Sequence, residues 1–139
     1  MYTLECHVGR LFEIRVQPPL SLEELKGFHP QVIRILGRIP GQLVGCTDLR
    51  KARVFNLDVA DRLKAIIRTE APRVDRNAYL VGESAVFSMQ IARVIRAAGI
   101  PSRRAFTNAK EAITWLSEVL TEPEVVRLRE FIAAGDAHP

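Results

Sequence analysis

The chain has 139 residues, of which 47% are hydrophobic and 26% are charged, and its formal net charge at pH 7 is +4. This length suffices for one domain with its own core, and the composition excludes a disordered or fibrous chain. Acidic and basic residues are interspersed, whereas proteins dedicated to nucleic acids cluster their positive charge. We therefore expect no nucleic-acid partner.

Two stretches at the start of the chain alternate apolar and polar side chains, as half-buried strands do. They span residues 2–7 and 12–17, and the turn between them contains Gly9. Two such stretches joined by a short turn predict an antiparallel hairpin. Pro18-Pro19 ends the second strand, because proline has no amide hydrogen to donate to a neighbouring strand.

The first helix is predicted to begin at a capping box formed by Ser21 and Glu24. Its apolar residues recur at helical spacing toward Gly37, although Gly27 and Pro30 interrupt the pattern. We expect a kink or a restart at Pro30, because proline lacks a backbone donor and clashes with the preceding turn.

Residues 41–48 form the predicted third strand, and the next helix ends before Pro72. Asp58 and Asp61 resemble a capping pair at the start of that helix. Because an aspartate side chain can accept hydrogen bonds from the free amides of a helix start, we expect Asp58 to be the N-cap.

The middle of the chain predicts a strand, a tight turn and a helix. Residues 77–81 are a short apolar run, and Gly82-Glu83 forms the turn. Ser84 can cap a helix whose apolar residues recur at one-face spacing as far as Ala98. Gly99 then ends the helix in the left-handed conformation. We expect this strand to lie between the third and fifth strands of the sheet.

Residues 103–106 form the predicted fifth strand. Asn108 and Glu111 predict a second capping box and a helix after it. An additional C-terminal helix is predicted over residues 121–134. We expect this helix either to cover an exposed sheet face or to contact a second copy of the chain. Residues 135–139 are expected to fray.

The predicted order of elements is β-β-α-β-α-β-α-β-α-α. Strands that alternate with helices indicate right-handed crossovers between parallel strands. We therefore expect an α/β domain over residues 1–120, with a five-stranded, mixed and mostly parallel sheet that begins with an antiparallel hairpin.

The sequence completes no familiar catalytic constellation. Ser84 lies on a strand-to-helix turn, as the nucleophile of a hydrolase does, but Val86 stands where that motif needs glycine. The histidine of a triad would have to be His138, near the end of the chain. Walker and G-x-G-x-x-G motifs are absent. We therefore expect no catalytic residue, no cofactor and no enzyme activity.

Cys6 and Cys46 have no cysteine or histidine at metal-ligand spacing, so we expect two free thiols and no metal site. The chain opens without the segments of a signal peptide, and no apolar stretch approaches the roughly 20 residues of a membrane span. These features predict a cytoplasmic protein without a stable membrane anchor.

Two groups of basic residues follow predicted strands and helices. The ordinary interpretation is a solvated surface paired with nearby acids. The sharper interpretation is a docking patch for an acidic partner or an anionic membrane. The groups are Arg50, Lys51 and Arg53, and Arg93, Arg96, Arg103 and Arg104.

The order of elements, the segment VFNLDVADRLKAII and the ending RRAFTNAKEAITWL resemble the SpoIIAA-like and STAS group, which includes bacterial anti-sigma factor antagonists. Phe106, Ala112, Trp115 and Leu116 match the usual ending of the SpoIIAA-like branch. The resemblance covers roughly residues 2–120. It implies a (βα)n superhelix with helices mainly on one face of the sheet, related to the CRAL-TRIO lipid-transfer fold. Arginine supplies 16 of the 20 basic residues, a bias typical of GC-rich bacterial genomes.

The chain departs from the STAS pattern at one place. Phosphorylatable STAS switches carry serine or threonine at the start of the helix after the third strand, and Phe55-Asn56-Leu57-Asp58-Val59 has no hydroxyl there. Asp58 supplies a fixed negative charge instead. It either imitates a phosphorylated residue or only caps the helix.

The leading hypothesis is a non-enzymatic regulatory or scaffold module that binds a protein partner in a bacterial signalling pathway, with a homodimer also open. In open α/β sheets, ligands bind beyond the carboxyl ends of the strands, and this argument is one of fold analogy. The residues expected to contact the partner are Arg53, Asn56, Asp58, Glu83 and Ser84.

The alternative hypothesis is a binder of a small apolar ligand or lipid, by analogy with the lipid-transfer relatives. Its pocket would lie between the helices and the sheet, where the interruption at Gly27 and Pro30 could open space. Such a pocket needs a volume of a few hundred Å³.

Overall fold

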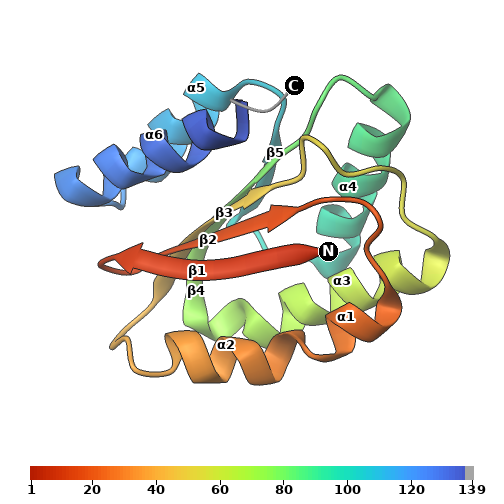
Figure 1. Cartoon of the computed structure of the whole chain (residues 1–139), viewed down its shortest axis with the longest axis horizontal. Coiled ribbons are helices and arrows are strands. Elements are labelled where there is room, and N and C mark those ends of the chain that lie inside the picture. Colours follow the sequence, from red (N-terminus) through yellow and green to blue (C-terminus); the bar gives the residue numbers. More distant parts are fainter. Residues whose placement is uncertain (137–139) are drawn as a thin grey trace.

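The structure, a computed structural model, describes residues 1–136 and contains one five-stranded sheet. The strands lie in the order β1-β2-β3-β4-β5, with β1 antiparallel to β2 and all other pairs parallel (Figure 1). The predicted mixed, mostly parallel sheet with an N-terminal hairpin is therefore confirmed. The strands are β1 (Tyr2–Val8), β2 (Leu11–Val16), β3 (Leu43–Asp48), β4 (Val74–Leu80) and β5 (Arg103–Phe106).

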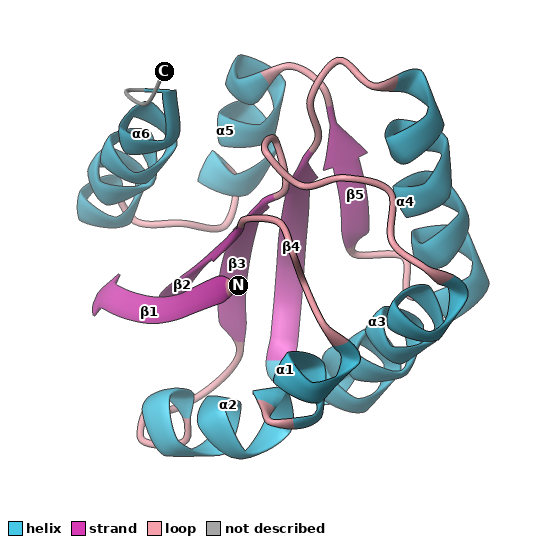
Figure 2. Cartoon of the chain, turned by 45° about the vertical axis from the view of Figure 1, so that its right-hand side comes forward, coloured by secondary structure: helices cyan, strands magenta, loops and turns pink. Residues whose placement is uncertain are grey.

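Helices cover both faces of the sheet (Figure 2). Four helices pack on one face, and the last two helices of the chain cover the other face. No helix within residues 1–136 combines the length and apolar character needed to cross a bilayer. The first face carries α1 (Leu22–Lys26), α2 (Phe28–Leu36), α3 (Leu57–Glu70) and α4 (Ala85–Ala98), the second carries α5 (Ala109–Ser117) and α6 (Glu122–Asp136), and a short 3₁₀ helix, η1 (Ala71–Arg73), precedes β4.

β3 is the middle strand, and each of its side chains is buried because both faces of the sheet are covered. Val44 and Cys46 join the core formed with α5 and α6, whereas Leu43 belongs to the core under α1 to α4. Successive side chains of a strand point to opposite faces. Thr47 therefore shares the face of Leu43, and Asp48 lies on the α6 side.

The first predicted helix breaks at Gly27, so the expected break at Pro30 is wrong. α1 does begin at the predicted capping box, in which Ser21 Oγ accepts from the Glu24 amide and Glu24 Oε1 accepts from the Ser21 amide. Gly27 closes α1 and opens α2. Pro30 lies in the first turn of α2, where amides have no intrahelical acceptor and proline is tolerated.

α3 begins earlier than predicted. Oδ1 of Asn56 accepts a hydrogen bond from the Val59 amide at 2.9 Å, so Asn56 is the N-cap and the assignment of Asp58 is wrong. Asparagine and aspartate cap helices about equally well, and the chain uses the earlier of the two. Asp58 lies in the first turn instead, at the positive end of the helix dipole.

The central strand, turn and helix are confirmed. β4 lies between β3 and β5, although it begins at Val74 rather than at Asn77. Ser84 Oγ accepts from the Phe87 amide at 3.2 Å and caps α4. Gly99 ends the helix with a left-handed φ of 72°.

The C-terminal helix is longer than predicted. Asn108 caps α5 as expected. α6 continues to Asp136, so Gly135 and Asp136 do not fray. Gly135 is buried beside the side chains of Asp48 and Arg50. Residues 137–139, which include His138 and the rest of the predicted frayed tail, lie outside the described residues.

Candidate functional site

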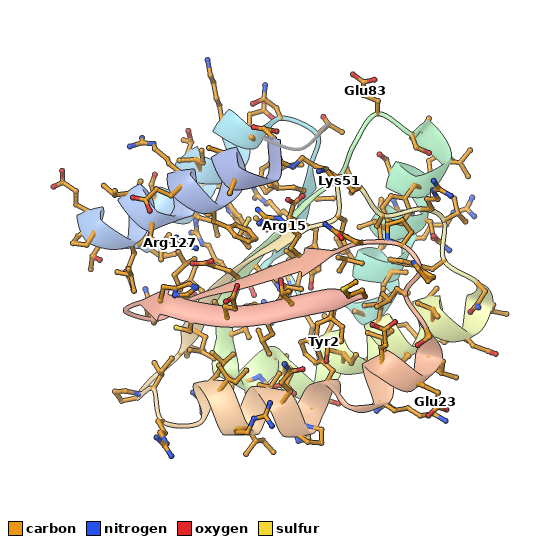
Figure 3. The ribbon with its side chains drawn as sticks, in the orientation of Figure 1. Tyr2, Arg15, Glu23, Lys51, Glu83 and Arg127 are labelled. Carbon is orange, nitrogen blue, oxygen red and sulfur yellow. The ribbon has the colours of Figure 1, made fainter. Side chains whose placement is uncertain are left out.

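The five residues predicted to contact a partner fall on two elements. Glu83 and Ser84 occupy the turn between β4 and α4, and Glu83 points away from the molecule (Figure 3). Arg53, Asn56 and Asp58 lie on the loop between β3 and α3 and at the start of α3. This loop leaves the carboxyl end of β3 and passes alongside α4 (Figure 1). All five residues are exposed.

The loop between β3 and α3 is held against the middle of α4. Gln90 binds both backbone groups of Phe55: its Oε1 accepts from the amide at 2.8 Å, and its Nε2 donates to the carbonyl at 2.7 Å. The Phe55 ring packs edge-on against Phe87, with centroids 5.2 Å apart. These contacts satisfy the loop backbone and give it a defined path on the helix.

Large apolar side chains are exposed on either side of this contact. Val54, on the loop, is 53% exposed, and Leu57, the first residue of α3, is 74% exposed. Val86 and Met89 are 67% and 57% exposed. They share the flank of α4 that carries Gln90, because residues three and four positions apart are neighbours on a helix. We call Val54, Leu57, Val86 and Met89 the loop–α4 surface.

Exposed charges of both signs lie on the same segments as the loop–α4 surface and on the turn before α4. The cations are Lys51 and Arg53 on the loop and Arg93 on α4, and the acids are Asp58 and Glu83. Within residues 1–136, none of these five side chains takes part in an ion pair. Their charges are therefore available to a molecule that contacts the surface.

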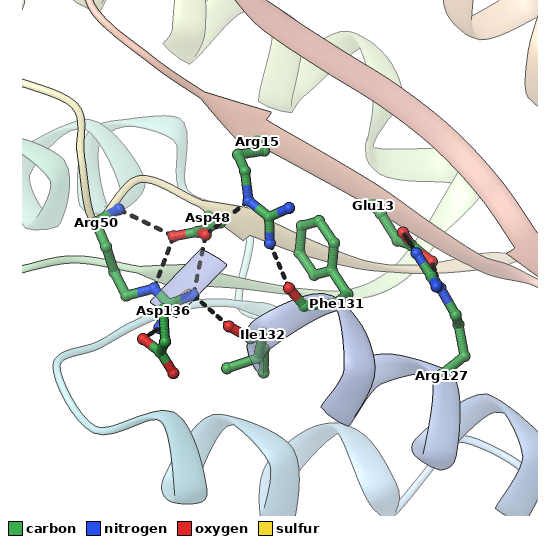
Figure 4. Close-up of polar contacts among 8 residues, drawn as sticks. All are labelled: Glu13, Arg15, Asp48, Arg50, Arg127, Phe131, Ile132 and Asp136. Atoms are coloured by element: carbon green, nitrogen blue, oxygen red, sulfur yellow. Dashed lines mark hydrogen bonds and ion pairs between the residues drawn. The ribbon is translucent and has the colours of Figure 1, made fainter. Parts of the chain in front are cut away.

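Arg50, which was predicted to be a surface cation beside Arg53, is instead part of the fold (Figure 4). It donates to Asp48 from its backbone amide and its guanidinium, and to the Ile132 carbonyl of α6 at 2.8 Å. Arg15 donates to Asp48 at 3.0 Å. Burial opposes the charge on Asp48, but the hydrogen bonds from the arginines outweigh it, so the pKa of this carboxyl lies below its ordinary 3.8.

A second ion pair joins α6 to the hairpin. Nε and Nη2 of Arg127 each donate to one carboxylate oxygen of Glu13 at 2.7 Å (Figure 4). Glu13 is only 1% exposed, although its alternating strand predicts a solvent-facing side chain. The sequence feature that predicts this burial is the apolar stripe of the final helix, because such a stripe must pack against another element and so covers part of the sheet.

Within the described part of the chain, the serine and cysteine side chains considered for covalent or metal chemistry have structural roles or are at least partly buried. Ser84 Oγ serves as a helix cap. Cys46 is fully buried, burial raises the pKa of its thiol, and Cys6 is half-buried. Among residues 1–136, no three histidine, cysteine or acidic side chains gather as metal ligands. The loop–α4 surface itself offers apolar contact and exposed charge.

Comparison with known proteins identifies no relative, since no family model, no curated protein and no solved structure matches the chain. The resemblance to the SpoIIAA-like and STAS group therefore rests on the sequence segments given above.

Proposed function

We propose that this chain is a non-enzymatic regulatory or scaffold module of SpoIIAA-like or STAS type. In this proposal its loop–α4 surface binds another protein in a bacterial signalling pathway. The partner presents an apolar contact face together with charges of both signs, since Arg53, Arg93, Asp58 and Glu83 are exposed on or next to the same two segments as the apolar side chains.

The observation that carries the proposal is the distribution of exposed apolar side chains. Seven large apolar side chains are exposed within the described residues, and four of them lie on the two segments that the Phe55–Gln90 hydrogen bonds hold together. Grouped apolar side chains on a protein surface mark interaction sites, whereas single scattered ones need no explanation. The other three, Met1, Ile33 and Val126, lie on separate parts of the fold.

The position of the surface supports the same proposal. In STAS switches, the start of the helix after the third strand is the regulated segment, and here that segment is the start of α3. Leu57 is its first helical residue and has the largest exposed fraction among these apolar side chains, at 74%. Asp58 adds a fixed negative charge in the same turn.

The test compares tagged wild-type protein with a Leu57→Glu/Met89→Glu variant, each expressed in the native host, by affinity capture and quantitative mass spectrometry. The variant should retain its partner about tenfold less, because new carboxylates would have to be buried in an apolar contact. Asp58→Ala and Arg53→Glu should also weaken capture while leaving the melting temperature nearly unchanged, because both side chains are exposed.

Ile33→Glu and Val126→Glu are matched controls, since they make the same change at exposed apolar positions elsewhere. These controls should capture the partner as wild type does. Sedimentation velocity of the purified proteins tests whether the partner is a second copy of the chain. A dimer formed by wild-type protein but not by the double variant would show that the surface binds another copy rather than a different protein. Unchanged capture by the double variant would show that the loop–α4 surface is not the docking site.

A further inference from the structure

A small cavity of about 90 Å³ lies between the sheet and the layer of α1 to α4. Side chains of the strands and of all four helices line it, and most of them are apolar. The cavity lies where a ligand pocket was expected, but it is smaller than the few hundred Å³ that a lipid-sized ligand needs. Four polar side chains enter the lining from β3, β4 and β5, namely Thr47, Asn77, Tyr79 and Arg103, and Tyr2 of β1 and Glu70 of α3 also line it.

Sheet register brings these four residues together. Asn77 lies opposite Arg103 on the neighbouring strand, and Thr47 lies opposite Tyr79. Thr47 Oγ1 is 3.2 Å from Asn77 Oδ1, to which it donates, and Asn77 Nδ2 donates to Tyr79 Oη at 3.3 Å. None of the four is more than 8% exposed. A buried polar strip therefore crosses the sheet floor of an apolar cavity.

Arg103 has a donor to spare in this strip. Its Nη1 donates to Ser102 Oγ at 2.8 Å and to the Ser102 carbonyl at 3.2 Å. Its Nη2 is buried and has no hydrogen-bond partner within residues 1–136, and the residue is 4% exposed. The nearby Asp75 is paired with Arg10 at 3.6 Å. A buried guanidinium nitrogen without an acceptor is unfavourable, so this position favours a ligand that brings one, and a charged acceptor binds arginine most strongly.

Tyr79 provides a second donor. Its oxygen accepts from Asn77, and within the described residues its hydroxyl hydrogen has no acceptor. Burial raises the pKa of Tyr79 to about 12, with Arg103 opposing the shift, so the phenol stays protonated at neutral pH. A protonated phenol can donate one hydrogen bond to a carboxylate oxygen.

We propose that the cavity binds a short-chain monocarboxylate, whose carboxylate accepts hydrogen bonds from Arg103 Nη2 and Tyr79 Oη and whose chain packs against the apolar lining. The carboxylate supplies the acceptor that Arg103 Nη2 lacks. A cavity of about 150 Å³ holds benzene, which has six non-hydrogen atoms, so a space of about 90 Å³ holds about four, the size of acetate. This site goes beyond the proposed protein-binding function and uses other polar residues, so either proposal can fail alone.

The test titrates ¹⁵N-labelled wild-type protein with sodium acetate and follows the amide resonances of the strands that line the cavity. Acetamide and ethanol serve as neutral ligands of the same chain length, and sodium chloride controls for ionic strength. Acetate should produce saturable shifts at Tyr79 and Arg103. The neutral ligands should bind about tenfold more weakly or worse, because a charge-assisted hydrogen bond is lost.

Arg103→Met should weaken acetate binding about tenfold or more, and Tyr79→Phe should weaken it by a smaller factor of about three to ten. Arg104→Met is the matched control, because Arg104 is the neighbouring arginine on the same strand but lies over Trp115 on the opposite face, 5.2 Å from the ring centroid. The Arg104→Met variant should bind acetate as wild type does. Circular dichroism melting checks that each variant folds.

Equal binding of acetate and acetamide would overturn the proposal, as would the absence of saturable shifts in wild-type protein. Both results are obtained with wild-type protein, so they test the proposal even if Arg103→Met fails to fold. Octanoate tests the size limit. Tighter binding of octanoate than of acetate would show that the cavity opens to a lipid-sized chain, and the short-chain assignment would then be wrong.

Discussion

Asp48 and Arg50 bind each other through three hydrogen bonds at the carboxyl end of the middle strand. Asp48 Oδ1 accepts from the Arg50 amide at 3.0 Å and from its Nε at 2.9 Å, and Oδ2 accepts from Nη2 at 3.1 Å. Arg50 and Arg15 also donate to the carbonyls of Ile132 and Phe131 near the end of α6. These contacts therefore join the carboxyl end of the middle strand to backbone carbonyls in the last two turns of α6.

The stability of the protein should depend on the ionisation of Asp48. Its pKa in the folded state lies below the ordinary 3.8, so the folded state binds this proton less readily than the unfolded state does. The contribution of the carboxylate is therefore complete above about pH 4 and is lost as the pH falls through the folded-state pKa. Urea denaturation at a series of pH values measures this loss.

Asp48→Asn is the variant that tests this dependence. It should lower the free energy of unfolding by about 2 kcal/mol at pH 7, because two partly buried arginines lose their acceptor. The difference from wild type should shrink below about pH 4. Asp136→Asn is the control, since Asp136 is exposed and should contribute less than about 0.5 kcal/mol. An equal difference at pH 7 and pH 3 would contradict the role given to Asp48.

Arg127→Met should destabilise the protein by about 3 kcal/mol, because it leaves the buried Glu13 carboxylate without its partner. Arg129→Met makes the same change at an exposed position of α6 and should cost less than about 0.5 kcal/mol. The double variant Glu13→Met/Arg127→Met should recover most of the loss, since an apolar pair can replace a buried ion pair. Equal urea midpoints for the two single arginine variants would show that Glu13 is not buried in solution.

Removal of α6 should unfold the domain, although the sequence suggested a separate domain over residues 1–120. Leu128, Phe131 and Ile132 of α6 are at most 4% exposed and pack with Leu11 of β2. Their loss would expose one face of the sheet, and a fragment of residues 1–120 should aggregate or show the collapsed amide dispersion of an unfolded chain. A cooperative thermal transition of that fragment, like that of the full chain, would show α6 to be dispensable.

Helix starts were predictable because they depend on residues close together in the chain. Ser21, Ser84 and Asn108 all cap the helices that their sequence neighbours predicted. Errors arose where two local signals competed. The break predicted at Pro30 lies at Gly27, and the N-cap of α3 is Asn56, two residues before the predicted Asp58. Neighbouring residues define the set of candidate boundaries, and tertiary packing selects among them.

The sequence by itself determined the order of strands and helices, the hairpin and the mostly parallel sheet, because hydrophobic period and turn chemistry are local properties. Only the tertiary structure decided which polar side chains are buried. Glu13 and Arg103 belong to alternating or basic stretches that predict solvent contact, yet α6 covers the first and the layer of α1 to α4 covers the second. Burial depends on which distant element packs over a strand, and that choice is made by the whole fold.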